Sequence, residues 1–342
     1  MTAVQPRTAR TSGSFPRTRI PDEALIKKVR ALGKIFRPTP IVATSIPGLK
    51  LFAKLECQNP FGSIKDRAAY GMLSAAVDRG DVRQGTTLIE SSSGNFAAAL
   101  AGLCHMLELN FIPVIDPNIN TSRESFLRGI CPAVVKVVER DDTGGFLKTR
   151  LAKVKELCAK DRETYWPNQY GNLDGVNAHY RLTAGEICDQ FSALDVVFIG
   201  VSTGGTISGV SRRLKEHFPK IKVVAVDAVG SIIFGGAPGK RHIPGIGASI
   251  NLTLIDHSLI DDVIHVPEHE TVQACYELRD EHGLFLGGSS GSVFAAAKQY
   301  AAKLRDSQKE PTALLLCADG GAAYLETVYN PVWASRLGSS KA

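Results

Sequence analysis

The feature that most constrains the fold of this 342-residue chain is a repeated alternation of short apolar runs with helical patterns. A strand that is apolar along its whole length is buried on both faces, and helices between such strands are typical of parallel sheets. The sequence therefore predicts an α/β fold with two doubly wound parallel sheets and a cleft between them. The expected strands form two series, the second of which begins near residue 165; they are 87–90, 111–115, 134–138, 196–199, 223–226 and 313–316.

The two series predict two domains. We expect residues 63–163 to form a smaller domain, and residues 21–62 together with 164–342 to form a larger one. Residues 1–20 contain no acidic residue and many Arg, Ser, Thr and Pro residues. This composition predicts a disordered tail at the N-terminus.

Composition excludes several classes of protein. The chain has a net charge of +6, 44% hydrophobic residues, and no apolar run long enough to span a bilayer. No block of basic residues interleaved with aromatics predicts nucleic-acid binding, whereas a mild positive charge suits anionic small molecules. The seven cysteines are scattered and form no CxxC pair, which predicts reduced thiols in a cytoplasmic protein. His242, His265 and His269 lack the spacing of metal ligands, so no metal is expected.

A lysine stands at an unusual place. Pro60 and Gly62 end an expected strand, Ser63 is a suitable N-cap, and a helical pattern follows. Lys65 therefore falls in the first helical turn, where the positive end of the helix dipole disfavours a cation. A lysine that loses part of its preference for the charged form is a better nucleophile. Alone, this pattern is also compatible with a solvated lysine on a helix surface.

Three expected strand-to-helix turns are rich in Gly, Ser and Thr, and these are residues 91–95, 200–206 and 287–291. Such turns lie at the carboxyl ends of parallel strands, where backbone N–H groups can approach an anion. Residues 204–209 do not have the GxGxxG spacing of a dinucleotide-binding turn, and residues 235–240 do not have the spacing of a Walker motif. Three such turns with Lys65 point to a cofactor that carries a phosphate and a substrate that carries a carboxylate.

The sequence resembles the pyridoxal-phosphate (PLP) enzymes of the cysteine synthase and cystathionine β-synthase family. The resemblance runs from about residue 31 to 329 and rests on segments 63–67, 92–95, 202–206 and 287–291, in that order. It implies the type II fold of PLP enzymes, in which the smaller domain is a mobile substrate domain and the larger domain binds PLP. Segments 165–170, 226–235 and 243–249 further resemble members that make a precursor of 2,3-diaminopropionate, including those of siderophore biosynthesis.

The resemblance implies roles for the cofactor-binding residues. Lys65 would bind PLP covalently and would later move the Cα proton of the substrate. Asn95 would hydrogen-bond the ring hydroxyl, and Ser289 would face the pyridine nitrogen, where a neutral hydroxyl favours β-replacement over transamination. The cradle for the PLP phosphate would be formed by Ser202, Thr203, Gly204, Gly205 and Thr206.

Substrate contacts are expected on other segments. Ser91, Ser92, Ser93 and Asn95 present donors that suit an amino-acid carboxylate. Gln169 matches the second carboxylate contact of the family. Arg241 can grip a phosphate through two parallel hydrogen bonds, so we expect it to bind the phosphate of a phosphoserine substrate. His179 is expected to be structural.

The resemblance implies β-replacement in a homodimer that takes small amino-acid substrates. O-phospho-L-serine and L-glutamate would be joined, with release of phosphate. An alternative is a cysteine synthase that uses O-acetylserine or O-phosphoserine with sulfide. A third is a PLP-binding relative that has lost turnover and acts as a regulatory partner; the intact lysine and turns disfavour it.

Overall fold

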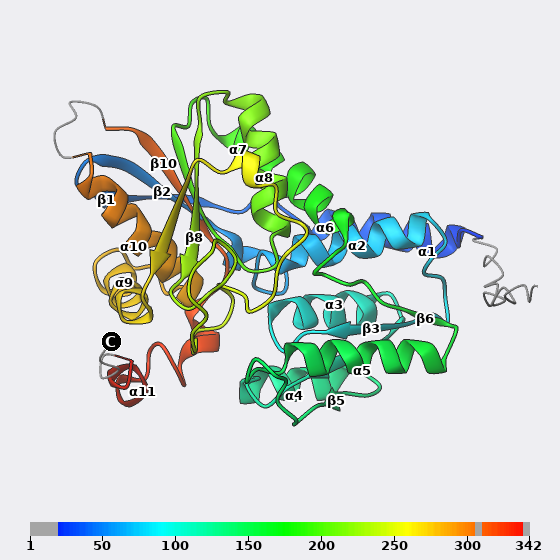
Figure 1. Ribbon diagram of the computed structural model, residues 1–342. Coiled ribbons are helices and arrows are strands. Elements are labelled where there is room, and N and C mark those ends of the chain that lie inside the picture. The colour runs from blue at the N-terminus through cyan, green and yellow to red at the C-terminus, as the bar shows by residue number, and fades with distance from the viewer. Residues whose placement is uncertain (1–19, 305–309, 338–342) are drawn as a thin grey trace, which may run out of the picture.

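The computed structural model describes residues 20–304 and 310–337. The tail predicted for residues 1–20 lies outside the described residues except for its last position. Figure 1 shows two groups of elements, one around a six-stranded sheet and one around a four-stranded sheet. The α/β fold with two largely parallel sheets, expected from the sequence, is confirmed.

The larger sheet has the strand order β1-β2-β10-β7-β8-β9. All neighbouring pairs are parallel except β1 and β2, which pair antiparallel at one edge. The central strands are buried along their length, as continuous apolar runs require. The strands are β1 (Ile41–Ile46), β2 (Leu49–Leu55), β7 (Val196–Gly200), β8 (Lys222–Ala228), β9 (Asp262–Val266) and β10 (Thr312–Cys317).

The smaller sheet is parallel throughout and has the order β5-β4-β3-β6. Its strands are β3 (Thr87–Ser91), β4 (Asn110–Ile115), β5 (Val135–Lys136) and β6 (Thr164–Tyr165). The strand predicted for residues 134–138 thus shortens to two residues. The segment near residue 165, expected to open the second series, instead adds β6 to this sheet.

Helices connect the strands of both sheets. They are α1 (Glu23–Leu32), α2 (Lys65–Asp78), α3 (Asn95–Met106), α4 (Thr121–Ile130), α5 (Leu147–Lys160), α6 (Leu173–Ala178), α7 (Ala184–Gln190), α8 (Gly205–His217), α9 (Glu268–Asp280), α10 (Gly288–Ala302) and α11 (Pro331–Ser335). One core packs α1, α2 and α3 against the four-stranded sheet, and two others cover the two faces of the six-stranded sheet.

The segment 287–291 does not follow a strand, unlike the other two glycine-rich turns. Residues 287–291 were predicted to follow a strand, but they follow α9 and a single bridge between Leu286 and Gly320. Gly287 is the N-cap of α10, and the rest of the segment forms the first helical turn. The position near the carboxyl end of β10 arises because this bridge ties Leu286 beside the segment that follows β10.

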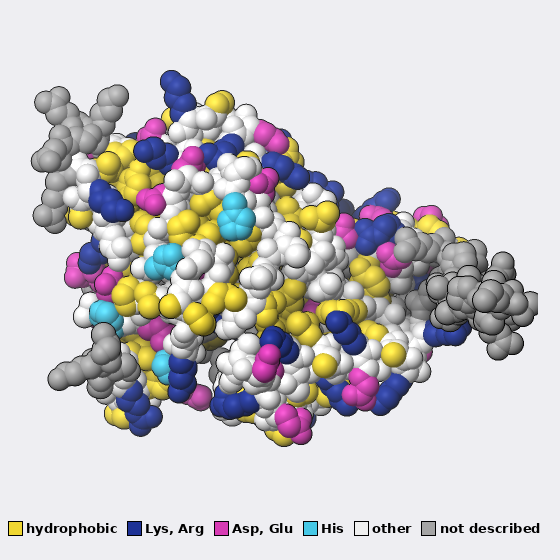
Figure 2. Space-filling model, viewed as in Figure 1, with side chains coloured by type: hydrophobic (Ala, Val, Ile, Leu, Met, Phe, Trp, Pro, Cys, Tyr) yellow, Lys and Arg dark blue, Asp and Glu magenta, His cyan; other side chains and the backbone are white. Residues whose placement is uncertain are grey.

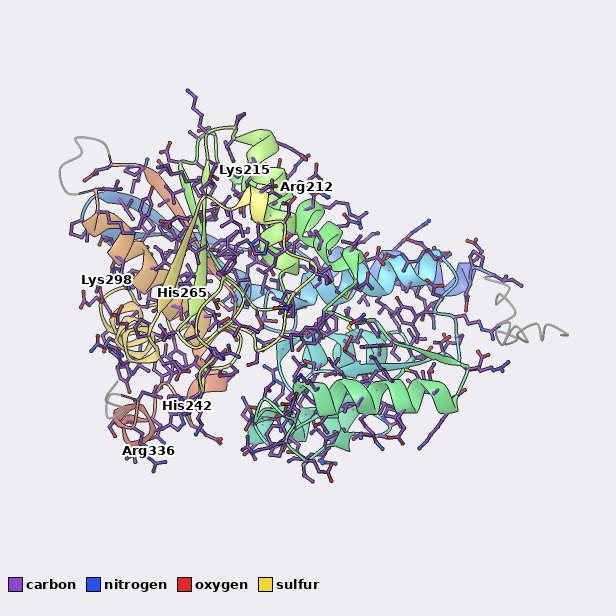
Figure 3. All side chains as sticks on the ribbon, viewed as in Figure 1. Arg212, Lys215, His242, His265, Lys298 and Arg336 are labelled. Atoms are coloured by element: carbon purple, nitrogen blue, oxygen red, sulfur yellow. The ribbon has the colours of Figure 1, made fainter. Side chains whose placement is uncertain are left out.

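Charges are mixed over the surface. On the face seen in Figure 2, basic and acidic side chains alternate, and no large patch of one sign is visible there. The Lys and Arg residues labelled in Figure 3 come from three parts of the chain, with Arg212 and Lys215 on α8, Lys298 on α10 and Arg336 after α11. Within the described residues, no helix combines the length and apolar character needed to cross a membrane.

A close helix crossing generates the first prediction. A Cβ atom on Gly209 of α8 would lie 2.2 Å from the carbonyl oxygen of Val176 on α6. We expect Gly209→Ala to lower the free energy of unfolding by about 1–3 kcal/mol, because backbone atoms must move apart. Gly185→Ala on α7 is the control, since nothing lies within 4 Å of its Cβ. Urea unfolding measures both; equal midpoints would contradict the prediction.

Candidate active site

A cavity of about 600 Å³, including its open mouth, lies between the two sheets. Elements of both sheets line it, and most of them contribute residues next to a strand's carboxyl end or a helix's N-terminus. Seven of the predicted site residues line this cavity, together with Gly200 of the predicted 200–206 turn. The seven are Lys65, Asn95, Ser202, Thr203, Gly204, Thr206 and Ser289. Gly205 lines a second, adjoining cavity of about 250 Å³.

Lys65 is the first residue of α2, as predicted. The helix begins at Lys65, so its N-cap is Ile64 and not the predicted Ser63. The Ser63 hydroxyl still accepts a hydrogen bond from the Lys65 N–H at 3.2 Å. The Lys65 amine lies 3.5 Å from the hydroxyl of Thr203 and lines both cavities. Burial lowers the pKa of Lys65 to about 8, although the nearby Asp319 carboxylate opposes this shift. A substantial neutral fraction at neutral pH makes this amine a nucleophile and a base.

The segment after β7 forms an anion cradle. Gly204 is the N-cap of α8 and has a φ of +89°, a conformation that favours glycine. A Cβ at Gly204 would lie 2.6 Å from the side chain of Ile255, so the turn has no room for one. The first N–H groups of α8 lack intrahelical acceptors and can donate into the cavity. This geometry suits a phosphate.

His179 is more closely tied to the cradle than the sequence indicated. Its Nε2 lies 3.2 Å from the hydroxyl of Thr206, and its Nδ1 lies 3.0 Å from that of Thr183. Burial lowers the pKa of His179 well below its usual value, and the positive charges of Lys65 and Arg67 add to the shift. A neutral imidazole between two hydroxyls fixes the orientation of Thr206. The signal in the sequence was weak, since His179 is distant from residue 206 along the chain.

Asn95 links the two halves of the molecule. Its amide donates to Asp319 Oδ2 at 2.7 Å and accepts from Arg123 at 2.8 Å. Asp319 follows β10, also accepts from the Tyr324 hydroxyl at 2.8 Å, and lines the cavity. Its Oδ1 is buried without a hydrogen-bond partner, and burial raises the pKa of this carboxyl.

Sequence reasoning gave Asp319 and Arg123 no role. The position of Asp319 directly beyond a predicted strand was a usable signal for a cavity residue. Arg123 lies in the first turn of α4, and nothing in the local sequence marks it. Ser289 lies in the first turn of α10 and lines the cavity.

The three serines predicted to bind the substrate carboxylate lie behind the residues that line the cavities. Ser92 Oγ accepts from the N–H groups of Gly94 and Ala97 and so caps α3, while Ser93 Oγ accepts from the Asp116 N–H at 2.9 Å. Ser91, Ser92 and Ser93 are not among the residues lining either cavity. Gln169 lines the second cavity and donates to the Ser91 carbonyl at 3.1 Å.

Arg241 does not line either cavity. Its guanidinium donates to the carbonyls of Gly230 and Ala248 at 3.2 and 2.9 Å, and to the Ser249 hydroxyl at 2.8 Å. These contacts join two loops beside the six-stranded sheet. In this arrangement three of the five N–H groups of Arg241 are bonded to its own loops, so the side chain supports these loops.

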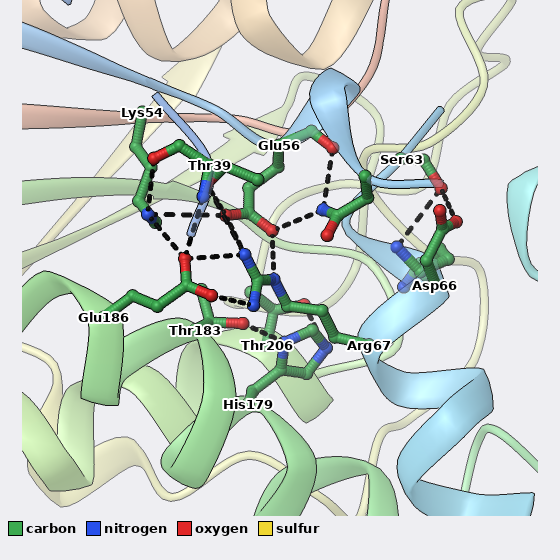
Figure 4. A network of polar contacts seen from close by, with 12 residues as sticks. Thr39, Lys54, Glu56, Ser63, Asp66, Arg67, His179, Thr183, Glu186 and Thr206 are labelled. Carbon is green, nitrogen blue, oxygen red and sulfur yellow. Dashed lines mark hydrogen bonds and ion pairs between the residues drawn. The ribbon is translucent and has the colours of Figure 1, made fainter. Parts of the chain in front are cut away.

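A buried ion cluster surrounds Arg67, two residues after Lys65 in the sequence (Figure 4). Arg67 Nε donates to Glu56 at 2.7 Å, and both terminal nitrogens of Arg67 donate to Glu186 at 2.6 and 2.8 Å. The Lys54 amine donates to Glu186 at 3.0 Å. The side chains of Lys54, Glu56 and Arg67 have no exposed surface. Two positive and two negative charges balance, as burial requires.

Comparison with known proteins identifies the family. The family model described as "Pyridoxal-phosphate dependent enzyme" matches residues 33–318. The chain belongs to this family. Two curated PLP-family relatives, from Ralstonia nicotianae and Cupriavidus metallidurans, are both 40% identical over 86% of this chain and 86% of their own length. Each is named N-(2-amino-2-carboxyethyl)-L-glutamate synthase.

Solved structures of PLP enzymes have the same fold. The crystal structure of an O-acetylserine-dependent cystathionine β-synthase from Helicobacter pylori matches with a TM-score of 0.79 and 30% identity, over 86% of this chain and 96% of that one. A hydrogen-sulfide-producing enzyme from Fusobacterium nucleatum matches with the same TM-score and identity, over 85% and 98%. The protein therefore has the type II fold of PLP enzymes and uses pyridoxal phosphate as its cofactor.

The residues of the cavity fit this cofactor. A lysine amine with a lowered pKa and the N-terminus of α8 after the Gly204 turn both face the same cavity. An amine can bind an aldehyde covalently, and the free N–H groups of a helix N-terminus suit a phosphate. Pyridoxal phosphate carries both groups on one ring.

Arg67 generates a stability prediction. Arg67→Met leaves Glu56 and Glu186 with Lys54 as their one remaining buried cation, so we expect a loss of about 3–5 kcal/mol in the free energy of unfolding. Arg83→Met is the control, because Arg83 and Glu163 form an exposed ion pair, whose removal should change stability little. Denaturant unfolding of both variants measures the difference. Similar losses would show that the buried cluster is not needed for stability.

Gly204 generates a prediction about cofactor affinity. Gly204→Ala should weaken cofactor binding roughly tenfold, since displacement of one N–H group from the phosphate loses about 1.5 kcal/mol. Gly85→Ala is the control: its φ of +88° is almost the same, but nothing lies within 4 Å of its Cβ. Titration of the cofactor-free protein with pyridoxal phosphate measures both. Equal affinities would contradict the cradle.

Proposed function

We propose that this PLP enzyme catalyses a β-replacement that joins O-phospho-L-serine and L-glutamate to N-(2-amino-2-carboxyethyl)-L-glutamate, with release of phosphate. Two relatives at 40% identity that carry this name support the proposal. The observation that carries it is the cavity, in which the Lys65 amine faces the hydroxyl-rich turn at the start of α8. The product would be a step towards L-2,3-diaminopropionate in siderophore or natural-product biosynthesis.

The chain's own residues would perform four tasks. Lys65 Nζ holds the cofactor, takes the Cα proton of the substrate and returns it after replacement. Ser202–Thr206 hold the phosphate of the cofactor, with Thr206 oriented by His179. Asn95 contacts the ring hydroxyl, and Ser289 contacts the ring nitrogen as a neutral donor. When bound, pyridoxal phosphate supplies the electron sink that makes the Cα proton acidic and lets the β-substituent leave.

The substrate carboxylate would be held by the 91–95 turn together with Gln169. The structure supports this through the second cavity, which adjoins Lys65 and is lined by Gln169, Asn172 and His179. Ser91, Ser92 and Ser93 would contribute through the shape and N–H groups of their turn. Arg241 would act on the phosphate of the substrate only if its loops rearranged, because its guanidinium is bound to their carbonyls.

We also propose that the four-stranded half is a mobile substrate domain that closes over bound substrate. The sequence predicted residues 63–163 for this domain; because β6 pairs with β3, we extend it to about residue 165, with residues 21–62 and those after 165 forming the larger PLP-binding domain. The contacts across the cavity mouth support this, since Asn95 donates to Asp319 and Asn120 donates to the Ala323 carbonyl at 3.0 Å. Closure would exclude water and hold the reacting atoms in position.

A homodimer in the cytoplasm is the proposed state. All seven cysteines are free thiols, which supports a reducing compartment. Leu325 and Val332 are 58% and 67% exposed and supply apolar surface for an interface between two copies.

Cysteine synthase activity is the second candidate. The two solved structures at 30% identity have titles that name an O-acetylserine-dependent enzyme and a hydrogen-sulfide-producing enzyme. Both candidates share the lysine, the cradle and the first half of the reaction. They differ in the nucleophile, which is a second amino acid in one case and sulfide in the other.

A substrate matrix tests the proposal. The purified enzyme is given O-phospho-L-serine or O-acetylserine as donor and L-glutamate or sulfide as acceptor, and the products are identified by mass. We expect the phosphoserine–glutamate pair to react fastest. Faster formation of cysteine would favour the second candidate, whereas bound cofactor without release of phosphate would indicate a non-catalytic protein. Lys65→Ala is the control, and should retain the fold but lose all turnover.

A further inference from the structure

Glu90 is a buried acid that the proposed reaction does not use. It stands near the carboxyl end of β3 and has no exposed surface. Its carboxylate accepts three N–H groups: Ser91 N at 2.8 Å, Trp166 Nε1 at 3.1 Å and Gln169 N at 3.2 Å. One side chain thus joins the turn after β3 to the segment after β6.

The backbone explains why an acid stands here. β6 pairs with β3 for only two residues, and a continued register would set Pro167, which has no N–H group, opposite Glu90. The chain leaves the sheet at Asn168, whose φ of +55° lies in the left-handed region that few non-glycine residues adopt. The Glu90 carboxylate accepts the N–H of Gln169 directly after this turn. The carboxylate thus supplies an acceptor to an N–H group that the β3–β6 ladder no longer reaches, and so stabilises the turn.

The position of Gln169 depends on this contact. The Gln169 backbone is bound to Glu90, and its side-chain amide donates to the Ser91 carbonyl at 3.1 Å. Gln169 lines the second cavity beside Lys65. We propose that Glu90 is a positioning residue, which fixes Gln169 and Ser91 relative to each other and so sets how tightly the carboxylate end of the substrate is held. The link to substrate rests on the proposed function, whereas the link to Trp166 and Gln169 does not.

The contact is sensitive to pH. Burial raises the pKa of Glu90 to about 7, although the N–H donors, Trp166 first among them, oppose the shift. The titratable groups facing it are Cys158 of α5 and Tyr170, and burial raises the pKa of both, so they stay neutral near pH 7. Glu90 thus gains its negative charge as the pH rises through about 7.

Deprotonation strengthens the three contacts, because an ionised carboxylate accepts hydrogen bonds more strongly than a neutral carboxyl. Protonation adds a donor where three N–H donors already converge. The nearby acid Asp116 is bound to Arg150 at 3.1 Å, so its charge is already neutralised. The substrate end of the site should therefore tighten as the pH rises through about 7.

Trp166 fluorescence provides a test that needs no substrate. The chain has two tryptophans, so Trp333→Phe leaves Trp166 as the only one. In this background we expect the emission of Trp166 to shift with a midpoint near pH 7, and Glu90→Gln to abolish the shift. The same titration in both proteins would overturn the proposal. Because no turnover is involved, a wrong substrate assignment does not affect this result.

Kinetics test the link to substrate. Glu90→Gln should raise KM for the amino-acid donor roughly three- to tenfold, the effect of one or two weakened hydrogen bonds, with kcat changed less than about twofold. Glu163→Gln is the matched control, since Glu163 is exposed, directly precedes β6 and pairs with Arg83. An unchanged KM, or a loss confined to kcat, would overturn the positioning role.

If Glu90→Gln does not fold, the pH dependence of KM in the parent enzyme tests the same proposal. The KM of the parent enzyme should fall as the pH rises, with the same midpoint as the Trp166 titration. Two different midpoints would overturn the proposal.

Discussion

The active site depends on the buried ion pairs that Arg67 makes with Glu56 and Glu186 at the start of α2. Glu56 follows β2 of the six-stranded sheet, and Glu186 lies on α7. Arg67 comes two residues after Lys65, so these contacts fix the helical turn that carries the nucleophile. Because each carboxylate is buried, removal of the guanidinium leaves a charge without a partner, and the cluster therefore tolerates little movement.

This cluster also influences charge in the cavity. The two carboxylates neutralise Lys54 and Arg67, so no net negative charge lies behind Lys65 to favour its ammonium form. Burial then dominates, and the amine is partly neutral near pH 8. His179 experiences the same desolvation and the positive charges of Lys65 and Arg67, which keep it neutral. Lys65 can thus exchange a proton near pH 8, whereas His179 stays neutral and serves to orient Thr206.

The sequence predicted the fold class and most of the cavity because apolar runs and glycine-rich turns report local backbone structure. Lys65, Gly204 and Ser289 were found in this way. Edge strands carry weaker patterns, so β1, β6 and β9 were not predicted. Asp319 was not assigned a role because its contacts come from residues remote in sequence. Arg241 was expected to bind the substrate phosphate, and no feature of the sequence indicated that its guanidinium would bond to the carbonyls of its own loops.

Two of the unpredicted groups, Glu90 and Asp319, share one physical origin. Each stands where a parallel strand ends, at the edge where backbone N–H groups lose their ladder partners and the cavity begins. A carboxylate there can accept hydrogen bonds from segments outside the sheet: Glu90 accepts the backbone N–H of Gln169, and Asp319 accepts the side-chain amide of Asn95. Both carboxyls have raised pKa values because they are buried. Burial of these two carboxyls, which lets them hold neighbouring segments in place, thus also makes their contacts sensitive to pH.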